Sequence, residues 1–205
     1  MTKRLTLCLL FIALLAGCKR HKKERIFAAI QAEPQASFHQ KQNNITCMVK
    51  KLTAQEEWDL FGDNLSLVDI HPFYLEIINH SSDVWYFSAR HISAPLASDG
   101  MVKDSLHKSQ SHAWTASLLA AIYCWPLIPV VIAPIAWWTY LENKDKDRFI
   151  EDHSVRAHER FFYIAPHERI KKLVCIYGWQ PGTIFDLAIT RDKDGFVSKF
   201  TVGVA

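Results

Sequence analysis

The chain has 205 residues, of which 49% are hydrophobic, and its formal net charge is +3. This length suits one domain of ordinary size with short attachments. Because basic and acidic residues nearly balance, the composition gives no reason to expect nucleic acid as a partner, and seven glycines leave little material for phosphate-binding loops.

Residues 1–17 have the layout of a secretory signal peptide. Lys3 and Arg4 form a positive start, an apolar run from Leu5 to Ala16 follows, and small residues end the segment. The run is shorter than the roughly 20 apolar residues that span a bilayer, so we expect export and cleavage instead of a transmembrane helix. The basic sequence KRHKKER that comes next opposes export, but the short apolar run favours it more strongly.

Residues 15–18, Leu-Ala-Gly-Cys, resemble the lipobox of bacterial lipoproteins. The resemblance implies that Cys18 carries acyl chains, palmitate among them, and becomes the first residue of the mature chain. Lys19 follows Cys18, and by analogy with Gram-negative lipoproteins this implies sorting to the outer membrane, facing the periplasm. The alternative is an ordinary signal peptide that is cut near Gly17, with Cys18 incidental.

Residues 18–44 are expected to form a lipid-anchored basic and polar tether of low order. Its basic start either pairs with anionic lipid head groups or stays solvated. Residues 45–205 are expected to form one domain, because they contain about seven short β-branched and aromatic runs at the spacing of a β-sandwich. The expected fold class is mainly β, a small immunoglobulin-like β-sandwich, although the Cys…Trp…Cys pattern of true immunoglobulin domains is missing.

The segments between these runs are expected to hold little regular structure. Residues 53–66 are predicted to be mostly loop, residues 101–106 to form at most a short strand, and residues 148–160 to form a short helix. Asp194-Gly195 is typical of a hairpin turn between the last two strands.

The apolar stretch 113–141 interrupts the strands and is expected to be an inserted helical hairpin. As one helix it would be about 44 Å long, too long for one span and too short for two. Pro126 and Pro129 are expected to break it into arms at 114–125 and 132–142, which dip into the leaflet that holds the acyl chains. The alternatives are a hairpin packed on protein and, less favoured, a single span. The aromatic residues expected to contact the membrane are Trp114, Trp125, Trp137, Trp138 and Tyr140.

Cysteine and histidine give few chemical signals. Cys47 and Cys175 lie in predicted strands and could form a disulfide between two sheets, or could be two small buried apolar residues. The histidines do not follow a metal-binding spacing, and the sequence contains no HExxH, CxxC, GxSxG or phosphate-binding glycine motif. We therefore predict no catalytic, cofactor-binding or metal-binding residues.

The sequence favours a non-enzymatic, membrane-anchored envelope lipoprotein with a scaffolding, assembly or partner-binding role. Its expected partners are membrane lipid, through the acyl chains on Cys18 and through the 113–141 hairpin, and a protein of the envelope. A single acyl chain binds a membrane only marginally, so a second membrane element is physically reasonable. The alternative is a membrane-associated enzyme that acts on lipid or cell-wall substrates.

Overall fold

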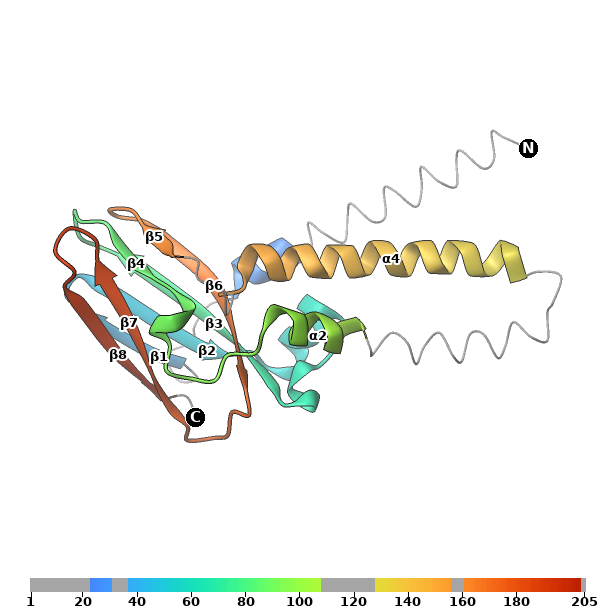
Figure 1. Cartoon of the computed structure of the whole chain (residues 1–205), viewed down its shortest axis with the longest axis horizontal. Helices are drawn as coiled ribbons and strands as arrows, with labels where there is room; N and C mark the ends of the chain where they lie inside the picture. The colour runs from blue at the N-terminus through green and yellow to red at the C-terminus, as the bar shows by residue number, and fades with distance from the viewer. Residues whose placement is uncertain (1–22, 31–36, 108–127, 156–160, 204–205) are drawn as a thin grey trace.

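The computed structural model describes residues 23–30, 37–107, 128–155 and 161–203 (Figure 1). Within these residues the chain forms two four-stranded sheets in which all neighbouring strands are antiparallel. The mainly β class is thus confirmed. Sheet A contains, in order, β1 (Ser37–Gln42), β2 (Ile45–Lys51), β3 (Ile70–Asn79) and β6 (Arg169–Tyr177), and sheet B contains β5 (Phe162–Ile164), β4 (Trp85–Phe87), β7 (Ile184–Arg191) and β8 (Val197–Gly203).

The first hydrophobic core lies between the two sheets. β8 shows the alternation that a half-buried strand requires, with Ser198, Phe200 and Val202 buried and the residues between them exposed. Phe73 of sheet A and Phe87 of sheet B are fully buried in the same cluster. The two sheets therefore pack face to face, as the predicted strand pattern indicated.

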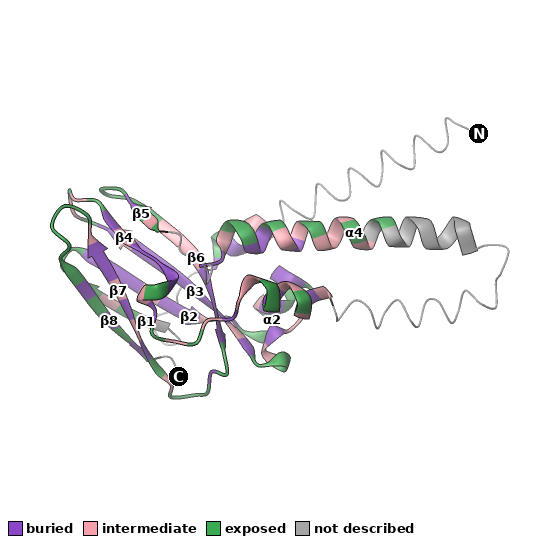
Figure 2. Ribbon diagram, in the orientation of Figure 1, coloured by how far each residue is buried: buried purple, intermediate pink, exposed green. Residues whose placement is uncertain are grey.

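Sheet A is also buried on its other face. Eight of the ten residues of β3 are buried, so this strand has no solvent-facing side. Tyr74 and Leu173 point away from sheet B and belong to a second core, which includes Phe61 and Ile150 from helices. The domain therefore has three layers, sheet B, sheet A and helices, whereas the sequence had predicted only the two sheets (Figure 1, Figure 2).

Two segments predicted to hold little regular structure form helices of this third layer. α2 (Ala54–Phe61) begins with a capping box, in which Thr53 and Glu56 each accept a hydrogen bond from the other's backbone N–H. α2 ends at Gly62, whose φ of +69° suits a residue without a Cβ. The expectation of a loop at 53–66 was therefore wrong, and so was the expectation of a strand at 101–106, because residues 99–107 are helical. Short 3₁₀ helices lie at η1 (Leu65–Val68) and η2 (Ala89–His91).

The longest element is α4 (Ile128–His153), which has 26 residues. The predicted break at Pro129 does not occur, because the helix begins one residue earlier and its first turn needs no backbone N–H at that place. Pro134 lies further inside, and the helix continues through it at the loss of one backbone hydrogen bond. The short helix predicted at 148–160 is the end of α4, which stops at His153. The other predicted arm, 114–125, lies outside the described residues, as does Pro126.

The tether predicted at 18–44 is shorter than expected. Residues 23–29 are helical, and Phe27 and Ile30 are 3% and 6% exposed within the second core. Residues 37–42 form β1, which pairs with β2 along its whole length. The sequence SFHQKQ contains one apolar residue, Phe38, so its pairing at the edge of sheet A was not predicted.

The apolar stretch lies within one long connection between neighbouring strands. β4 and β5 are adjacent and antiparallel in sheet B, with Tyr86 opposite Tyr163. The chain between them, residues 88–161, includes α4. The connection therefore leaves the sheet and returns to it at the same place.

Candidate functional site

α4 is divided by its sequence into two halves of different character. Residues 128–141, IPVVIAPIAWWTYL, contain no charged side chain, whereas residues 142–153 are mostly charged. Phe149 and Ile150 in the charged half are 4% and 0% exposed and belong to the second core. The uncharged half points away from the sheets (Figure 1). Among the described side chains of α4, those at its C-terminal end build it into the domain.

Exposed aromatic side chains mark the boundary between the two halves. Trp137 and Tyr140 are 53% and 54% exposed, and their ring centroids are 5.9 Å apart. The Lys144 ammonium lies 5.8 Å from the centroid of the Tyr140 ring. An apolar run followed by aromatic residues and then by cations is the order found where helices leave a membrane. Among the described residues, however, no helix is both long enough and apolar enough to span a bilayer.

Helix 99–107, which precedes the apolar stretch, is bound to the charged half of α4, which follows it. Nε2 of His107 lies 3.1 Å from the Asp147 carboxylate, and Nζ of Lys103 lies 2.7 Å from the Glu151 carboxylate. Exposed ion pairs stabilise little, but Leu106 of the same helix is also buried in the second core. The two helical segments on either side of the apolar stretch therefore lie against each other.

The helical segment 23–29 is bound to the same half of α4. Glu24 pairs with Nε2 of His153 at 3.0 Å, and the ring of Phe27 lies 5.6 Å from Phe149 and 4.5 Å from His153. Lys171 of β6 donates a hydrogen bond of 2.7 Å to the carbonyl of Ala28. The N-terminal segment therefore joins the domain at the base of α4.

The structure brings together two of the five predicted membrane-contacting aromatic residues, Trp137 and Tyr140. The backbone of Trp138 lies between them in α4, and its side chain is outside the description, as are Trp114 and Trp125. The predicted lipidation residue, Cys18, also lies outside the described residues.

The candidate disulfide between Cys47 and Cys175 is not formed, because both cysteines are free. Both lie in sheet A, on β2 and β6, with β3 between them. Cys47 faces the first core and Cys175 the second, so the two thiols are on opposite faces of one sheet. A disulfide needs Cβ atoms about 3.5–4.5 Å apart, which this arrangement forbids. The alternative prediction, that Cys47 and Cys175 are two small buried apolar residues, is confirmed.

Neither thiol is expected to react in the folded protein. Burial raises the pKa of Cys47 far above its usual range and, with the carboxylates of Asp99 and Glu57, raises the pKa of Cys175 to about 12. Because the thiolate is the reactive form, iodoacetamide at pH 8 should leave both cysteines unmodified until denaturant is added. Peptide mass mapping would measure this, and rapid alkylation of either residue in the native protein would contradict the packing described here.

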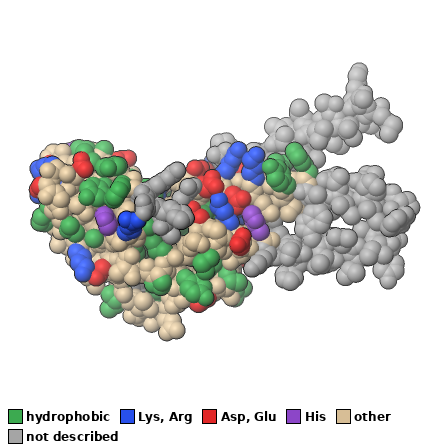
Figure 3. All heavy atoms as spheres, viewed as in Figure 1, with side chains coloured by type: hydrophobic (Ala, Val, Ile, Leu, Met, Phe, Trp, Pro, Cys, Tyr) green, Lys and Arg blue, Asp and Glu red, His purple; other side chains and the backbone are tan. Residues whose placement is uncertain are grey.

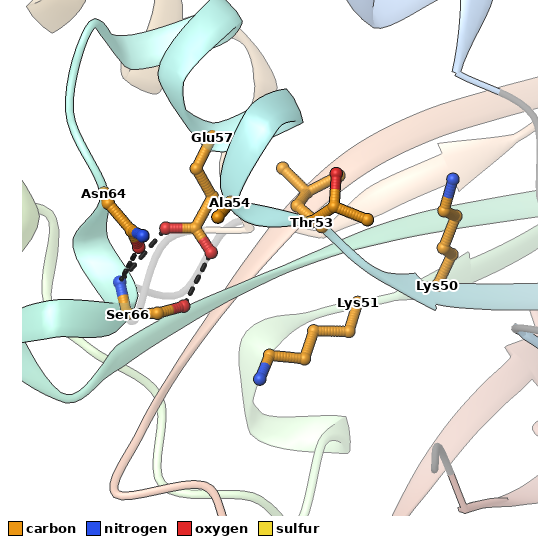
Figure 4. Close-up of a pocket in the computed structure, with 8 residues that line it drawn as sticks. Lys50, Lys51, Thr53, Ala54, Glu57, Asn64 and Ser66 are labelled. Carbon is orange, nitrogen blue, oxygen red and sulfur yellow. Dashed lines mark hydrogen bonds between the residues drawn. The ribbon is translucent and has the colours of Figure 1, made fainter.

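A pocket with a volume of about 390 Å³ lies where β2 meets α2 and η1 (Figure 4). Its polar groups are engaged with one another or with neighbours. The Glu57 side chain, 1% exposed, accepts hydrogen bonds from the backbone N–H and the hydroxyl of Ser66, at 3.0 and 2.6 Å. The pocket is lined by Lys50, Lys51, Leu52, Thr53, Ala54, Glu57, Asn64 and Ser66.

The two lysines of the pocket also have structural contacts. Nζ of Lys50 lies 2.9 Å from the Glu56 carboxylate, and Nζ of Lys51 lies 4.2 Å from the centroid of the Trp179 ring. These contacts explain the lysines as stabilising groups at the end of β2. The described residues also hold no group of three or more His, Cys, Asp or Glu side chains placed to bind a metal ion. The contacts around the pocket therefore indicate a joint between the sheet and the helical layer.

Glu56 should make the stability of this joint depend on pH. Burial alone would raise its pKa, but hydrogen bonds from Lys50 and Thr53 outweigh burial and hold the pKa below the usual 4.5. The folded state thus binds this proton less tightly than the unfolded state, and the stabilisation is present above pH 4.5 and lost as the pH falls through the folded-state pKa.

We expect Glu56→Gln to lower the free energy of unfolding by about 0.5–1 kcal/mol at pH 7, because the ion pair is lost and the cap is kept. The difference between the wild type and the variant should shrink as the pH falls from 7 to 3. Urea denaturation at the two pH values measures this, and a difference that does not shrink at pH 3 would show that the charge is not the cause.

The cap of α2 and the packing of the N-terminal segment both have signals in the sequence. Thr53 followed three residues later by Glu56 is a capping-box pattern. Phe27 and Ile30 stand three residues apart, which places them on one face of a helix. The bond between Glu57 and Ser66 joins two elements and has no local signal.

Comparisons with models of known protein families, with curated proteins and with solved structures find no match to this chain.

Proposed function

We propose that the chain is a non-enzymatic envelope lipoprotein that serves in scaffolding, assembly or partner binding. Acyl chains on Cys18, palmitate among them, attach it to a membrane, with the outer membrane facing the periplasm as the expected place. The apolar stretch 113–141 is a second membrane element that dips into the same leaflet as a hairpin. The observation that carries this proposal is α4, whose uncharged half stands away from the domain while its charged half is part of the second core.

The connection between β4 and β5 supports a stretch that enters and leaves the leaflet on one side. Helix 99–107 and the base of α4 are in contact, so a single crossing of the bilayer between them would have to separate elements that pack together. The uncharged half of α4 has 14 residues, which corresponds to about 21 Å. This length enters a hydrocarbon core of about 30 Å without crossing it.

The strand order supports an immunoglobulin-like sandwich as the finer description of the fold. Three strands of sheet A, β2, β3 and β6, face the four strands of sheet B. The chain passes between the sheets after β3, after β5 and after β6, as in sandwiches with Greek-key connections. β1 adds a fourth strand to the edge of sheet A.

An aromatic cluster on the outer face of sheet B supports partner binding. Phe161 and Tyr163 are 53% and 59% exposed, and the centroids of their rings lie 5.3 and 5.8 Å from that of Tyr86. Figure 3 shows hydrophobic side chains gathered on this part of the surface. Exposed aromatic residues are enriched in protein interfaces. The cluster is therefore the candidate surface for a protein of the envelope.

Metabolic labelling with a palmitate analogue tests the anchor. The wild-type protein should be labelled and should sediment with membranes, whereas Cys18→Ala should carry no label. Cys124→Ala is the matched control, because it removes another cysteine of the full chain and should keep the label. Equal labelling of wild type and Cys18→Ala would contradict the proposal.

A further inference from the structure

Two exposed apolar side chains lie in the helical layer, outside both cores. Leu67 and Val68 of η1 are 82% and 51% exposed, although they follow the buried Leu65 directly. The connection that leads to them meets α4, since a Cβ added at Gly62 would lie 3.7 Å from Nζ of Lys146 and 3.8 Å from a carboxylate oxygen of Glu142. The pair therefore belongs to the end of the domain from which α4 projects.

The position of this connection along α4 is close to the aromatic boundary. Glu142 and Lys146 follow Tyr140 by two and six residues, which is about 3 and 9 Å along the helix axis. The turn between α2 and η1 thus lies beside the first part of the charged half of α4, which begins just after the aromatic side chains. A surface that Trp137 and Tyr140 touch would pass close to this turn.

The proposed lipid anchor is within chain length of the same end of the domain. Lys23 and Asp145 line one small pocket on α4, and Cys18 precedes Lys23 by five residues, which span at most about 18 Å. Along α4, Trp137 is about 12 Å from Asp145. Acyl chains on Cys18 can therefore enter a bilayer at the depth at which Trp137 and Tyr140 meet its interface.

We propose that Leu67 and Val68 form a third contact with the leaflet that holds the acyl chains and the uncharged half of α4. This inference rests on the proposed lipid anchor. The occupant is lipid because the exposed apolar pair lies at the same end of the domain as Trp137 and Tyr140, the residues proposed to meet the membrane interface. Three separate contacts fix the tilt of the domain, so that the aromatic cluster on sheet B faces sideways along the membrane.

Fluorescent labelling of Val68→Cys tests this contact, with Val197→Cys as the matched control. The two valines are equally exposed, at 51%, but Val197 begins β8 at the end of the sheets remote from α4 (Figure 1). Both variants are made in the full lipidated chain with Cys124→Ala, and the buried Cys47 and Cys175 stay unlabelled. The protein is reconstituted into vesicles of phosphatidylethanolamine and phosphatidylglycerol, and the label is a nitrobenzoxadiazole.

On vesicles, the emission at position 68 should shift to shorter wavelength and should be quenched at least twofold by brominated lipid, whereas the label at position 197 should show neither effect. If the protein floats with vesicles and the label at position 68 stays in water, the lipid contact is wrong and the anchor stands. If the protein fails to float, the proposed function itself fails. A shift at position 68 that rises with protein concentration in detergent, without vesicles, would assign the patch to a second copy and overturn the proposal.

Discussion

Replacing Phe149 with alanine is expected to lower the free energy of unfolding by about 3–5 kcal/mol, the range for a buried phenylalanine. The side chain is 4% exposed. Its ring centroid lies 5.6 Å from that of Phe27, 6.1 Å from that of Phe61 and 4.7 Å from that of His153. It therefore joins α4 to the N-terminal segment and to α2, and the cavity left by alanine would be shared by three elements.

Urea denaturation of the full chain in mild detergent, followed by circular dichroism, measures this loss. Phe161→Ala is the control, because that ring is 53% exposed and its removal should change stability by less than about 1 kcal/mol. In the Phe149 variant, limited proteolysis should also cut the chain near residues 23–30, since Phe27 loses a partner. If both variants were equally stable, α4 would be an appendage and not a structural part of the domain.

The sheets could be predicted because their strands carry strong local signals. The hairpin of β7 and β8 follows from alternating apolar residues on both sides of Asp194-Gly195. β3 was also predicted as a strand, from its apolar run. The same run lacks the alternation of apolar and polar residues that a strand with one solvent-facing side would show. A strand that is buried on both faces needs a layer on each, so the sequence PFYLEII already implied a third layer above sheet A.

The helical layer was missed because its stability comes from contacts between distant segments. The helix at 23–29 is shorter than two and a half turns and is held by Phe149 and Tyr74, far away along the chain. The sequence predicted two shorter helices in place of α4, because proline has a large free-energy cost inside an isolated helix. That cost is smaller in the first turn, where Pro129 lies, and the packing of Phe149 and Ile150 supports the other end of the helix.

The parts of the candidate site that depend on composition could be predicted from the sequence, and the parts that depend on the packing of distant residues could not. The uncharged run with Trp137 and Tyr140 at its end is visible in the sequence. The free state of Cys47 and Cys175 is not, because it depends on which face of sheet A each residue occupies, and a shift of one residue in register would reverse it. The proximity of Gly62 to Glu142 and Lys146 likewise exists only in the folded chain.

Cysteines placed at Ser105 and at Lys144 are expected to lie on the same side of the membrane. Ser105 belongs to helix 99–107, and this helix contacts the charged half of α4 through the pairs of Lys103 with Glu151 and of His107 with Asp147. A chain that crossed the bilayer once between these positions would have to break both pairs and remove Leu106 from the second core.

A membrane-impermeant maleimide, applied to intact cells, to cells with a permeabilised outer membrane and to lysed cells, distinguishes the two arrangements. The Ser105→Cys and Lys144→Cys variants, made in a Cys124→Ala background, should become labelled at the same step. Val197→Cys reports the side of the sheets and should be labelled together with them, because all three positions belong to one folded unit. Labelling of Ser105→Cys and Lys144→Cys at different steps would mean that the stretch crosses the membrane, and that the contact between helix 99–107 and α4 does not exist in the cell.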